Sequence, residues 1–311
     1  MTQTLTIFSP AGVVREAAAL RRAQKHLARL GFDASLDASA LAKHQRFAGD
    51  DDTRLATLHR VAASGVDVAL AARGGYGMTR LLDRLDWALI AQSIANGTQW
   101  VGQSDLTALQ LGLLAHAKGC GPTWAGPLAA DDFGRTAEQG GVDDITEACF
   151  VEAMHEELEA IGFRESGAPR GTSPLDGFEA EGLLWGGNLS MVCSLLGTPH
   201  WPRIKGGILF LEEVGEHPYR VERMLLQLQQ AGVLDAQRAV LIGDVSRFKP
   251  APHDRGYTLK TAVAAVQART ATPLLMGLPH GHEATKVCLP VGAKAQMVVQ
   301  GRDVLLAWGH V

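Results

Sequence analysis

Short apolar runs alternate with longer amphipathic stretches through the first third of this chain. The apolar runs are Leu5–Phe8, Val66–Ala72 and Gln99–Gly102, and the amphipathic stretches are Arg15–Leu30, Met78–Ile94 and the residues after Ser104. Strands that alternate with helices in this way build βαβ units around a parallel sheet. Ligands of such sheets bind at the carboxyl ends of the strands, so we expect a functional site where these apolar runs end.

The second half of the chain predicts several strands and few helices. We expect strands at Leu183–Trp185, Gly207–Leu211, Ala239–Ile242 and Leu274–Leu278, a helix near Tyr219–Gln230, and a final hairpin of Ala293–Val299 and Val304–Trp308. The 311 residues exceed the usual size of a single core, and a hydrophobic content of 46% is enough for two. We therefore expect an N-terminal domain over 1–135 and a C-terminal domain over 177–311.

Residues 136–176 are predicted to join these domains. The region is polar and rich in glycine around one acidic helical stretch, Asp143–Ala160. Gly167–Pro174 has the composition of a linker.

Composition also limits the class of protein. The 29 Lys and Arg against 33 Asp and Glu give a net charge of −4 without a basic block, so nucleic acid is a poor candidate partner. The N-terminus is too short and polar for a signal peptide, and no apolar run approaches the roughly 18 residues of a membrane span. We expect a cytoplasmic protein with no membrane contact. The scattered cysteines, without a C-x-x-C motif, favour reduced and mostly buried thiols; they are Cys120, Cys149, Cys193 and Cys288.

The segment Trp100–Leu106 has the pattern of a nucleophile elbow. An apolar approach leads to Ser104 on a turn, and a helical run follows over Leu106–His116. This geometry exposes the serine hydroxyl above the backbone. It also directs the N–H groups at the N-terminus of the helix toward the negative charge that develops on the oxygen of an attacked carbonyl. The segment therefore suggests acyl transfer, although Ser104-Asp105 is also an ordinary helix N-cap and Leu106 stands where hydrolases usually carry glycine.

Two stretches of the second half could complete a serine-centred site. An apolar strand ends in Glu212-Glu213, where a carboxylate could orient a histidine and stabilise its imidazolium. A second strand leads into a Gly/Pro turn with His280 and His282, and histidine is the usual general base because its pKa lies near neutrality. A solvated acidic loop and a surface histidine are the simpler interpretations of the same residues.

Spacing excludes two other chemistries. The run His155-Glu156-Glu157-Leu158-Glu159 begins like a zincin helix but has Glu159 where the second histidine ligand belongs. The glycine-rich stretch 75–80 has Arg80 where a dinucleotide fingerprint needs its third glycine, and no Gly-Lys-Ser/Thr phosphate loop occurs in the sequence.

Taken in order along the chain, a set of short motifs resembles the LD-carboxypeptidases of the serine peptidase type (muramoyltetrapeptide carboxypeptidases), which are related to the microcin C immunity peptidases. The motifs are Arg73-Gly74-Gly75-Tyr76-Gly77, Gly102-Gln103-Ser104-Asp105, Ala125-Gly126-Pro127, Gly186-Gly187-Asn188-Leu189, Leu209-Phe210-Leu211-Glu212, Pro218-Tyr219-Arg220, Gly281-His282 and Leu289-Pro290-Val291-Gly292. Three of these motifs, when they occur together, are highly specific for the family: Gly102-Gln103-Ser104-Asp105, Leu209-Phe210-Leu211-Glu212 and Gly281-His282. The family more often has an aromatic residue at the position of Gln103, and Glu-Asp at the position of Glu212-Glu213.

The resemblance implies a Ser-Glu-His triad made of Ser104 as nucleophile, Glu212 as carboxylate and His282 as base. It also implies an α/β fold, with a flavodoxin-like parallel-sheet domain bearing the serine and a C-terminal domain with a small β-barrel-like core bearing the other two. The backbone N–H groups of Gly75 and Asp105 are the expected oxyanion donors. No metal or other cofactor is required. Glu213 remains a rival for Glu212, and His280 for His282.

The substrate implied by the resemblance is a cytoplasmic murein tetrapeptide, cleaved between an L-centre and the terminal D-alanine during cell-wall recycling. An exopeptidase must bind a free carboxylate, for which Arg73 and Arg220 are candidates, although either could be paired with a nearby acid instead. A homodimer is expected from the family. Three alternatives stay open: a microcin C-type immunity peptidase with the same triad, a metal-dependent hydrolase using His280 and His282, and a non-catalytic peptide-binding protein.

Overall fold

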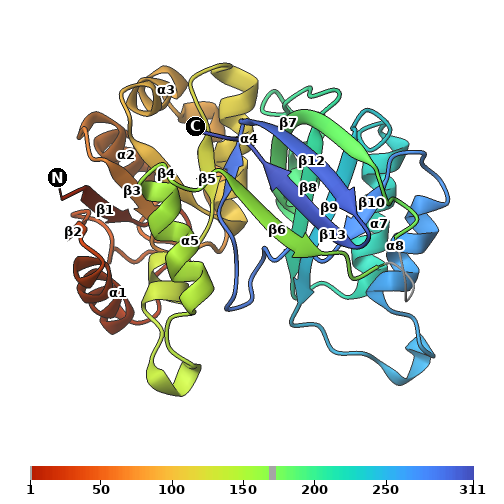
Figure 1. Cartoon of the computed structure of the whole chain (residues 1–311). Helices are drawn as coiled ribbons and strands as arrows, with labels where there is room; N and C mark the ends of the chain where they lie inside the picture. Colours follow the sequence, from red (N-terminus) through yellow and green to blue (C-terminus); the bar gives the residue numbers. More distant parts are fainter. Residues whose placement is uncertain (1, 168–172) are drawn as a thin grey trace.

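Two β-sheets lie side by side in the protein, whose computed structural model describes residues 2–167 and 173–311. In Figure 1 the N-terminal sheet is on the left and the C-terminal sheet on the right. The predicted linker Gly167–Pro174 falls largely on residues 168–172, which lie outside the described residues.

Six strands form the N-terminal sheet in the order β2-β1-β3-β4-β5-β11. Their bounds are β1 Thr4–Phe8, β2 Asp33–Leu36, β3 Val68–Ala71, β4 Gln99–Gly102, β5 Thr123–Ala125 and β11 Leu289–Val291. The first five strands pair in parallel, and β11 runs antiparallel to β5. The order 2-1-3-4-5 is that of flavodoxin-like folds, so the expected N-terminal architecture is confirmed.

Helices cover this sheet. Their bounds are α1 Ala17–Arg29, α2 Asp51–Ala63, α3 Trp87–Ala95, α4 Thr107–His116 and α5 Asp144–Met154. Figure 1 places α1 and α5 below the sheet and α2 and α3 above it. With both faces covered, a central strand such as β3 is buried along its whole length, which explains why it is a continuous apolar run in the sequence.

Seven strands form the C-terminal sheet in the order β10-β9-β8-β7-β12-β13-β6. Their bounds are β6 Ala160–Arg164, β7 Glu179–Asn188, β8 Ile208–Val214, β9 Ala239–Ser246, β10 Leu274–Met276, β12 Lys294–Gln300 and β13 Asp303–Ala307. The β7-β8-β9-β10 half is parallel and the β7-β12-β13-β6 half antiparallel. Within the described residues this sheet keeps two edges, β10 and β6, so the C-terminal core is an open mixed sheet where a small barrel-like core was expected.

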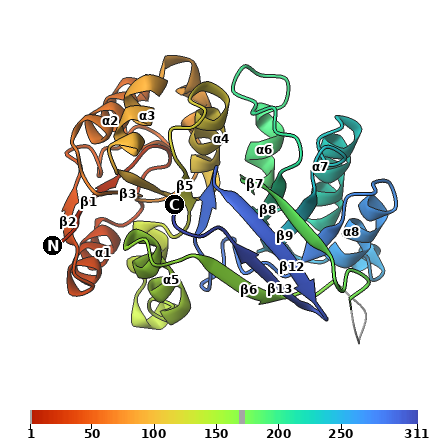
Figure 2. The same cartoon turned by 45° about the horizontal axis from the view of Figure 1, so that its top comes forward.

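A row of helices covers one face of both sheets. The C-terminal helices are α6 Leu189–Leu195, α7 Pro218–Gln230 and α8 Leu259–Gln267. Neighbouring helices touch in the order α2-α3-α4-α6-α7-α8, and Figure 2 shows this row across the top of the molecule. The contact between α4 and α6 joins the two halves.

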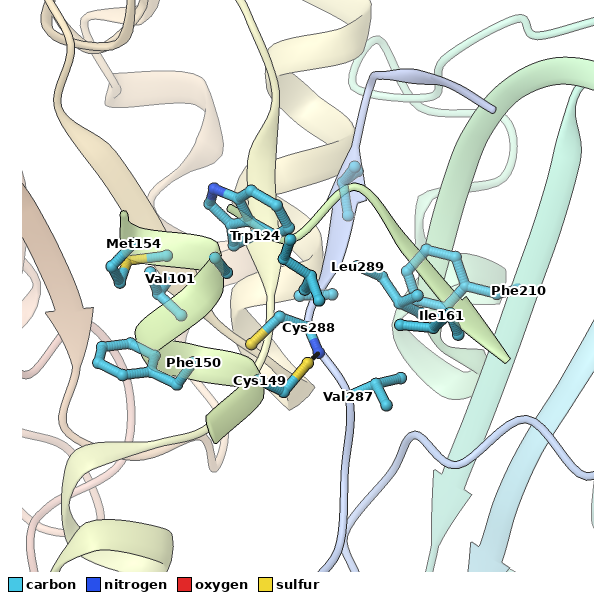
Figure 3. Packing of buried hydrophobic residues seen from close by; sticks show 14 of the residues in the cluster. Val101, Trp124, Cys149, Phe150, Met154, Ile161, Phe210, Val287, Cys288 and Leu289 are labelled. Carbon is cyan, nitrogen blue, oxygen red and sulfur yellow. Dashed lines mark hydrogen bonds between the residues drawn. The ribbon is translucent and has the colours of Figure 1, made fainter. Parts of the chain in front are cut away.

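The chain crosses between the halves three times, to β6, back to β11, and again to β12 and β13. β6 precedes the C-terminal stretch but extends the C-terminal sheet, and β11 returns from that stretch to the edge of the N-terminal sheet. One hydrophobic cluster consequently contains residues of both halves; Figure 3 shows Trp124, Cys149, Phe210 and Leu289 within it. This shared core fixes the halves against each other. The proposed boundaries at 135 and 177 stay a prediction.

The structure corrects two predicted helices. Met78–Ile94 is two short 3-10 turns followed by α3, which starts afresh after Asp86, whose side chain accepts a hydrogen bond from Leu89 N at 2.9 Å. The stretch Asp143–Ala160 contains only α5, and Ala160 already belongs to strand β6.

The four cysteines are free; Cys149 and Cys288 are buried as expected, whereas Cys120 and Cys193 are partly exposed. Within residues 2–167 and 173–311, no helix has the length and apolar character needed to span a bilayer.

Candidate active site

Ser104 lies at the carboxyl end of β4, between the sheet and α4. Gln103 before it is extended, while Ser104 itself has a φ of 63°, in the left-handed region that non-glycine residues rarely adopt. Such backbone strain is retained mainly at functional sites. The turn and the helix that follows it are the geometry expected of a nucleophile elbow.

The glycine-rich loop after β3 packs directly over this serine. A methyl group built on Gly74 would stand 2.6 Å from Ser104 Oγ and 3.6 Å from the backbone nitrogen of Asp105. Gly75 has a φ of 110°, and a methyl group there would stand 2.9 Å from Gly12 Cα. The loop therefore approaches the serine closely only because Gly74 and Gly75 lack side chains.

Asp105 has a structural role through its side chain. Its buried carboxylate accepts a hydrogen bond from Met78 N at 2.7 Å, and burial raises its pKa to about 6 against the opposing effects of that bond and of Arg54. Arg54 is itself buried and donates to Gly77 O at 2.9 Å. These contacts hold the glycine loop against the serine turn. Among the described residues, neither Gly75 nor Asp105 donates its N–H in a hydrogen bond outside the helices and strands.

Glu212 and His282 meet at the carboxyl end of β8. His282 Nδ1 lies 2.7 Å from Glu212 Oε2, and the carboxylate is fully buried. Burial by itself lowers the pKa of His282, but the hydrogen bond to Glu212 and its charge outweigh that effect, so the pKa is raised. This is the arrangement that fixes the tautomer of a catalytic histidine and leaves Nε2 free.

The two rival residues have other partners. Glu213 accepts hydrogen bonds from Asn188 Nδ2 at 3.0 Å and from Ser190 N at 2.8 Å, at the start of α6. His280 is fully buried, with Nδ1 2.9 Å from Val287 O, and burial lowers its pKa. Successive strand residues point to opposite faces, which explains why Glu212 faces His282 while Glu213 faces α6.

A pocket of about 450 Å³ opens beside His282 and is lined by both halves of the chain. Its lining includes Gln103 next to the serine, the histidine, and many charged side chains: Arg15, Glu16, Arg22, Arg73, Asp131, Asp132, Arg135, Arg247, Glu283 and Lys286. Arg73 donates to Val13 O at 2.8 Å, and its buried Nε has no partner in the part of the chain that the structure describes. Arg220 is not part of this lining and pairs with Glu216 at 2.5 Å.

The structure thus brings Glu212 to His282, and places Gly74, Gly75 and Asp105 around Ser104. Hydrogen bonds within the described ranges include none from Ser104 to His282. These ranges also contain no group of three His, Cys, Asp or Glu side chains able to hold a metal ion.

Apart from Arg73, the charged lining of the pocket was not predicted. Arg15 follows β1, and Asp131 and Asp132 follow β5, so the rule that ligands bind at strand ends could have indicated these three residues. The lining by Lys286 and Arg247 depends on how the two halves pack, and sequence spacing carries no signal for that.

Comparison with known proteins gives consistent matches along the chain. Residues 5–124 match the family model of the LD-carboxypeptidase N-terminal domain, and residues 181–297 match that of the C-terminal domain. A probable murein peptide carboxypeptidase of Bacillus subtilis is 31% identical, with 91% of this chain and 85% of the relative covered. The crystal structure of muramoyltetrapeptide carboxypeptidase from Oxalobacter formigenes is 36% identical, with a TM-score of 0.88 and 99% of each chain covered. The microcin C7 self-immunity protein MccF shares the fold at 22% identity, with a TM-score of 0.84 over 100% of this chain and 97% of its own.

Proposed function

Because this chain belongs to the LD-carboxypeptidase family, we propose that it is a serine carboxypeptidase that removes the terminal D-alanine from murein tetrapeptides. The observation that carries the proposal is the buried Glu212–His282 hydrogen bond of 2.7 Å, whose histidine lines the same pocket as Gln103, the residue before a serine held in a left-handed turn. The names of the relatives support the substrate class. The site residues rest on the geometry described above.

In the proposed reaction, Ser104 Oγ attacks the carbonyl carbon of the peptide bond before D-alanine, and its proton passes to His282 Nε2. The tetrahedral intermediate collapses, and His282 returns the proton to the nitrogen of the departing D-alanine. Water, deprotonated by the same histidine, then hydrolyses the acyl-enzyme. Glu212 stabilises the imidazolium in both steps and keeps its tautomer fixed.

Backbone N–H groups of Gly75 and Asp105 are proposed to bind the oxyanion. Gly75 follows Gly74, which packs against Ser104, and Asp105 follows Ser104 itself; among the described residues neither donates its N–H in a hydrogen bond outside the helices and strands. Each donor of this kind contributes on the order of 10²–10³ in rate, because it is aimed at charge that develops only in the transition state.

The pocket also fits a substrate rich in carboxylates. Five guanidinium groups line it, against four acidic side chains, one of which is neutralised by Lys286; the five are Arg15, Arg22, Arg73, Arg135 and Arg247. Of the two arginines suggested by sequence, we propose Arg73 as the carboxylate clamp, because it lines the pocket with an unpartnered Nε while Arg220 is paired with Glu216. A planar arginine fork binds a carboxylate through two parallel hydrogen bonds.

The direct test is incubation with L-Ala-D-Glu-mDAP-D-Ala, followed by mass spectrometry for loss of one alanine. We expect release of D-alanine by the native enzyme, in the presence or absence of a chelator, and no release by Ser104→Ala. Near-native turnover by a folded Ser104→Ala variant would overturn the serine mechanism. An aminoacyl sulfamoyl nucleoside serves as a second substrate, and exclusive cleavage of that compound would assign the chain to the immunity-peptidase type instead.

A cytoplasmic location and a homodimer remain part of the proposal, and the homodimer follows from the family alone. Cell fractionation tests the first, with activity expected in the cytoplasmic fraction. Light scattering coupled to size-exclusion chromatography tests the second, and a mass near the 33.1 kDa of one chain would contradict it.

A further inference from the structure

A buried ion pair lies beside the proposed catalytic histidine and joins the two halves of the chain. Lys286 Nζ contacts Asp132 Oδ1, and the two side chains are only 1% and 6% exposed. Lys286 follows His282 in the loop between β10 and β11, while Asp132 lies in a turn of π-helix (η4, Ala129–Phe133) after β5. Both side chains also line the pocket.

The loop that contains His282 passes from one sheet to the other. Before the histidine it is attached to the C-terminal sheet, where Asp244 N donates to His280 O at 2.9 Å. After the histidine it is attached to the start of α5, because Thr146 Oγ1 donates to Ala284 O and accepts from Lys286 N, both at 2.8 Å. His282 therefore lies at the junction, and its position depends on how this loop is held at both ends.

A short series of contacts leads from Lys286 to the serine turn. The second oxygen of Asp132 accepts a hydrogen bond from Leu128 N at 2.7 Å. The side chain of Leu128 packs over Gly102, where a built methyl group would stand 3.5 Å from Leu128 Cδ2. Gly102 is the last residue of β4, just before Gln103 and Ser104. The ion pair thus connects the loop of the base to the strand of the nucleophile.

Stability alone does not explain this pair. Removing two charges from water costs free energy that their attraction barely offsets, and a well-packed apolar pair at such a site is often as stable. What the charged pair adds is a directional contact between two defined atoms, one from each half of the chain. We propose that Lys286 and Asp132 are positioning residues that hold His282 in register with Ser104 across the junction between the two sheets.

Lys286 also contributes a charge close to the histidine. Burial lowers the pKa of His282, the bonded Glu212 and the charge of the more distant Glu213 raise it, and the charge of Lys286 lowers it; Asp131, Arg247 and Glu283 line the same pocket. Replacing Lys286 by a neutral residue should therefore raise the pKa of His282. Because the base must be neutral to accept a proton, the acid limb of kcat against pH should move to higher pH.

The test uses the full chain and a double variant, Lys286→Met with Asp132→Asn. The pair is neutral and near in shape, and the Asn oxygen can still accept from Leu128 N, so no unpaired charge is left buried. Asp132→Asn alone is the second variant, in case the double variant does not fold. The matched control is Arg60→Met with Asp37→Asn. This change removes another ion pair with a buried carboxylate, in which Arg60 Nε lies 2.8 Å from Asp37 Oδ2. Neither residue is part of the pocket lining.

With L-Ala-D-Glu-mDAP-D-Ala as substrate, we expect the double variant to lose about 10- to 100-fold in kcat, because a misplacement near 1 Å costs on that order. KM should change little, and the acid limb should move to higher pH. The control variant should lose thermal stability, but its kcat and the acid limb of kcat against pH should equal those of the native enzyme. Native kcat and an unmoved limb in the folded double variant, or native kcat in the folded Asp132→Asn variant, would overturn the inference.

This inference rests on the proposed serine mechanism, and the two fail differently. Activity that persists in Ser104→Ala would overturn the mechanism itself, and with it the role of the ion pair. An inactive Ser104→Ala together with a fully active ion-pair variant would overturn the positioning role alone.

Discussion

Gly74 and Ser104 lie so close together that no side chain fits between them: a methyl group on Gly74 would stand 2.6 Å from the serine Oγ. The glycine loop and the serine turn thus pack directly against each other, and the hydrogen bond from Met78 N to the Asp105 carboxylate holds them together. Ser104 is left half-buried.

We predict that Gly74→Ala lowers kcat about 100-fold or more, because the methyl group must displace Ser104 Oγ, and displacements near 1 Å cost on that order. The matched control is Gly162→Ala in β6, where the nearest atom to a built methyl group is 3.9 Å away. The measurement is kcat with the murein tetrapeptide, alongside thermal unfolding of both variants. Equal activity of the two folded variants would show that the loop does not fix the serine.

We predict that Glu212 acts in catalysis and that Glu213 acts in stability. Glu212 bonds His282, so Glu212→Gln is expected to lower kcat by on the order of 10³–10⁴, the loss typical of a triad carboxylate replaced by an amide. Glu213 serves the start of α6 through Asn188 and Ser190, so Glu213→Gln should cost about 1–3 kcal/mol of unfolding free energy with little change in kcat. Kinetics and urea denaturation of both variants test this, and the reverse ranking would move the triad to Glu213.

The pH dependence should identify the catalytic histidine. The Glu212 carboxylate keeps the pKa of His282 above its ordinary value of 6.5 in spite of burial, so the acid limb of kcat/KM should lie above pH 6.5. Burial lowers the pKa of His280, so a limb below pH 6.5 would indicate that histidine instead. In Glu212→Gln the remaining activity should have its limb at lower pH, because the amide no longer stabilises the imidazolium.

Much of the N-terminal half could be predicted because its strands are buried on both faces. β3 and β4 are short apolar runs that end at turns, and the elbow at Ser104 follows from the same local pattern. The predicted helix over Met78–Ile94 was wrong because α3 begins only after Asp86, whose side chain caps it. Apolar periodicity alone does not indicate this helix start. Local sequence resolved the strand ends but not every helix boundary.

The long-range part of the site could not be derived from spacing. Residues as far apart as Glu212 and His282 meet only through the order of β8, β9 and β10 in the sheet. The Lys286–Asp132 pair depends further on β11 returning to the N-terminal sheet, which no periodicity indicates. Resemblance to the family supplied the first contact and gave no indication of the second.

The final prediction concerns the stereochemistry of the substrate. Donors at Gly75 and Asp105 and a carboxylate clamp at Arg73 would fix the scissile carbonyl relative to Ser104. Inverting the chiral centre of the residue before or after the scissile bond would then direct that residue away from the subsite that binds it. Productive attack needs reacting atoms within about 3–3.5 Å. A peptide ending in L-centre–D-Ala should therefore be cleaved at least about 100-fold faster than its D-centre–D-Ala and L-centre–L-Ala isomers. A pentapeptide ending in D-Ala-D-Ala should be a poor substrate. Values of kcat/KM for the four peptides test this, and equal rates, or a preference for the D-Ala-D-Ala end, would contradict the L,D specificity while leaving the serine mechanism in place.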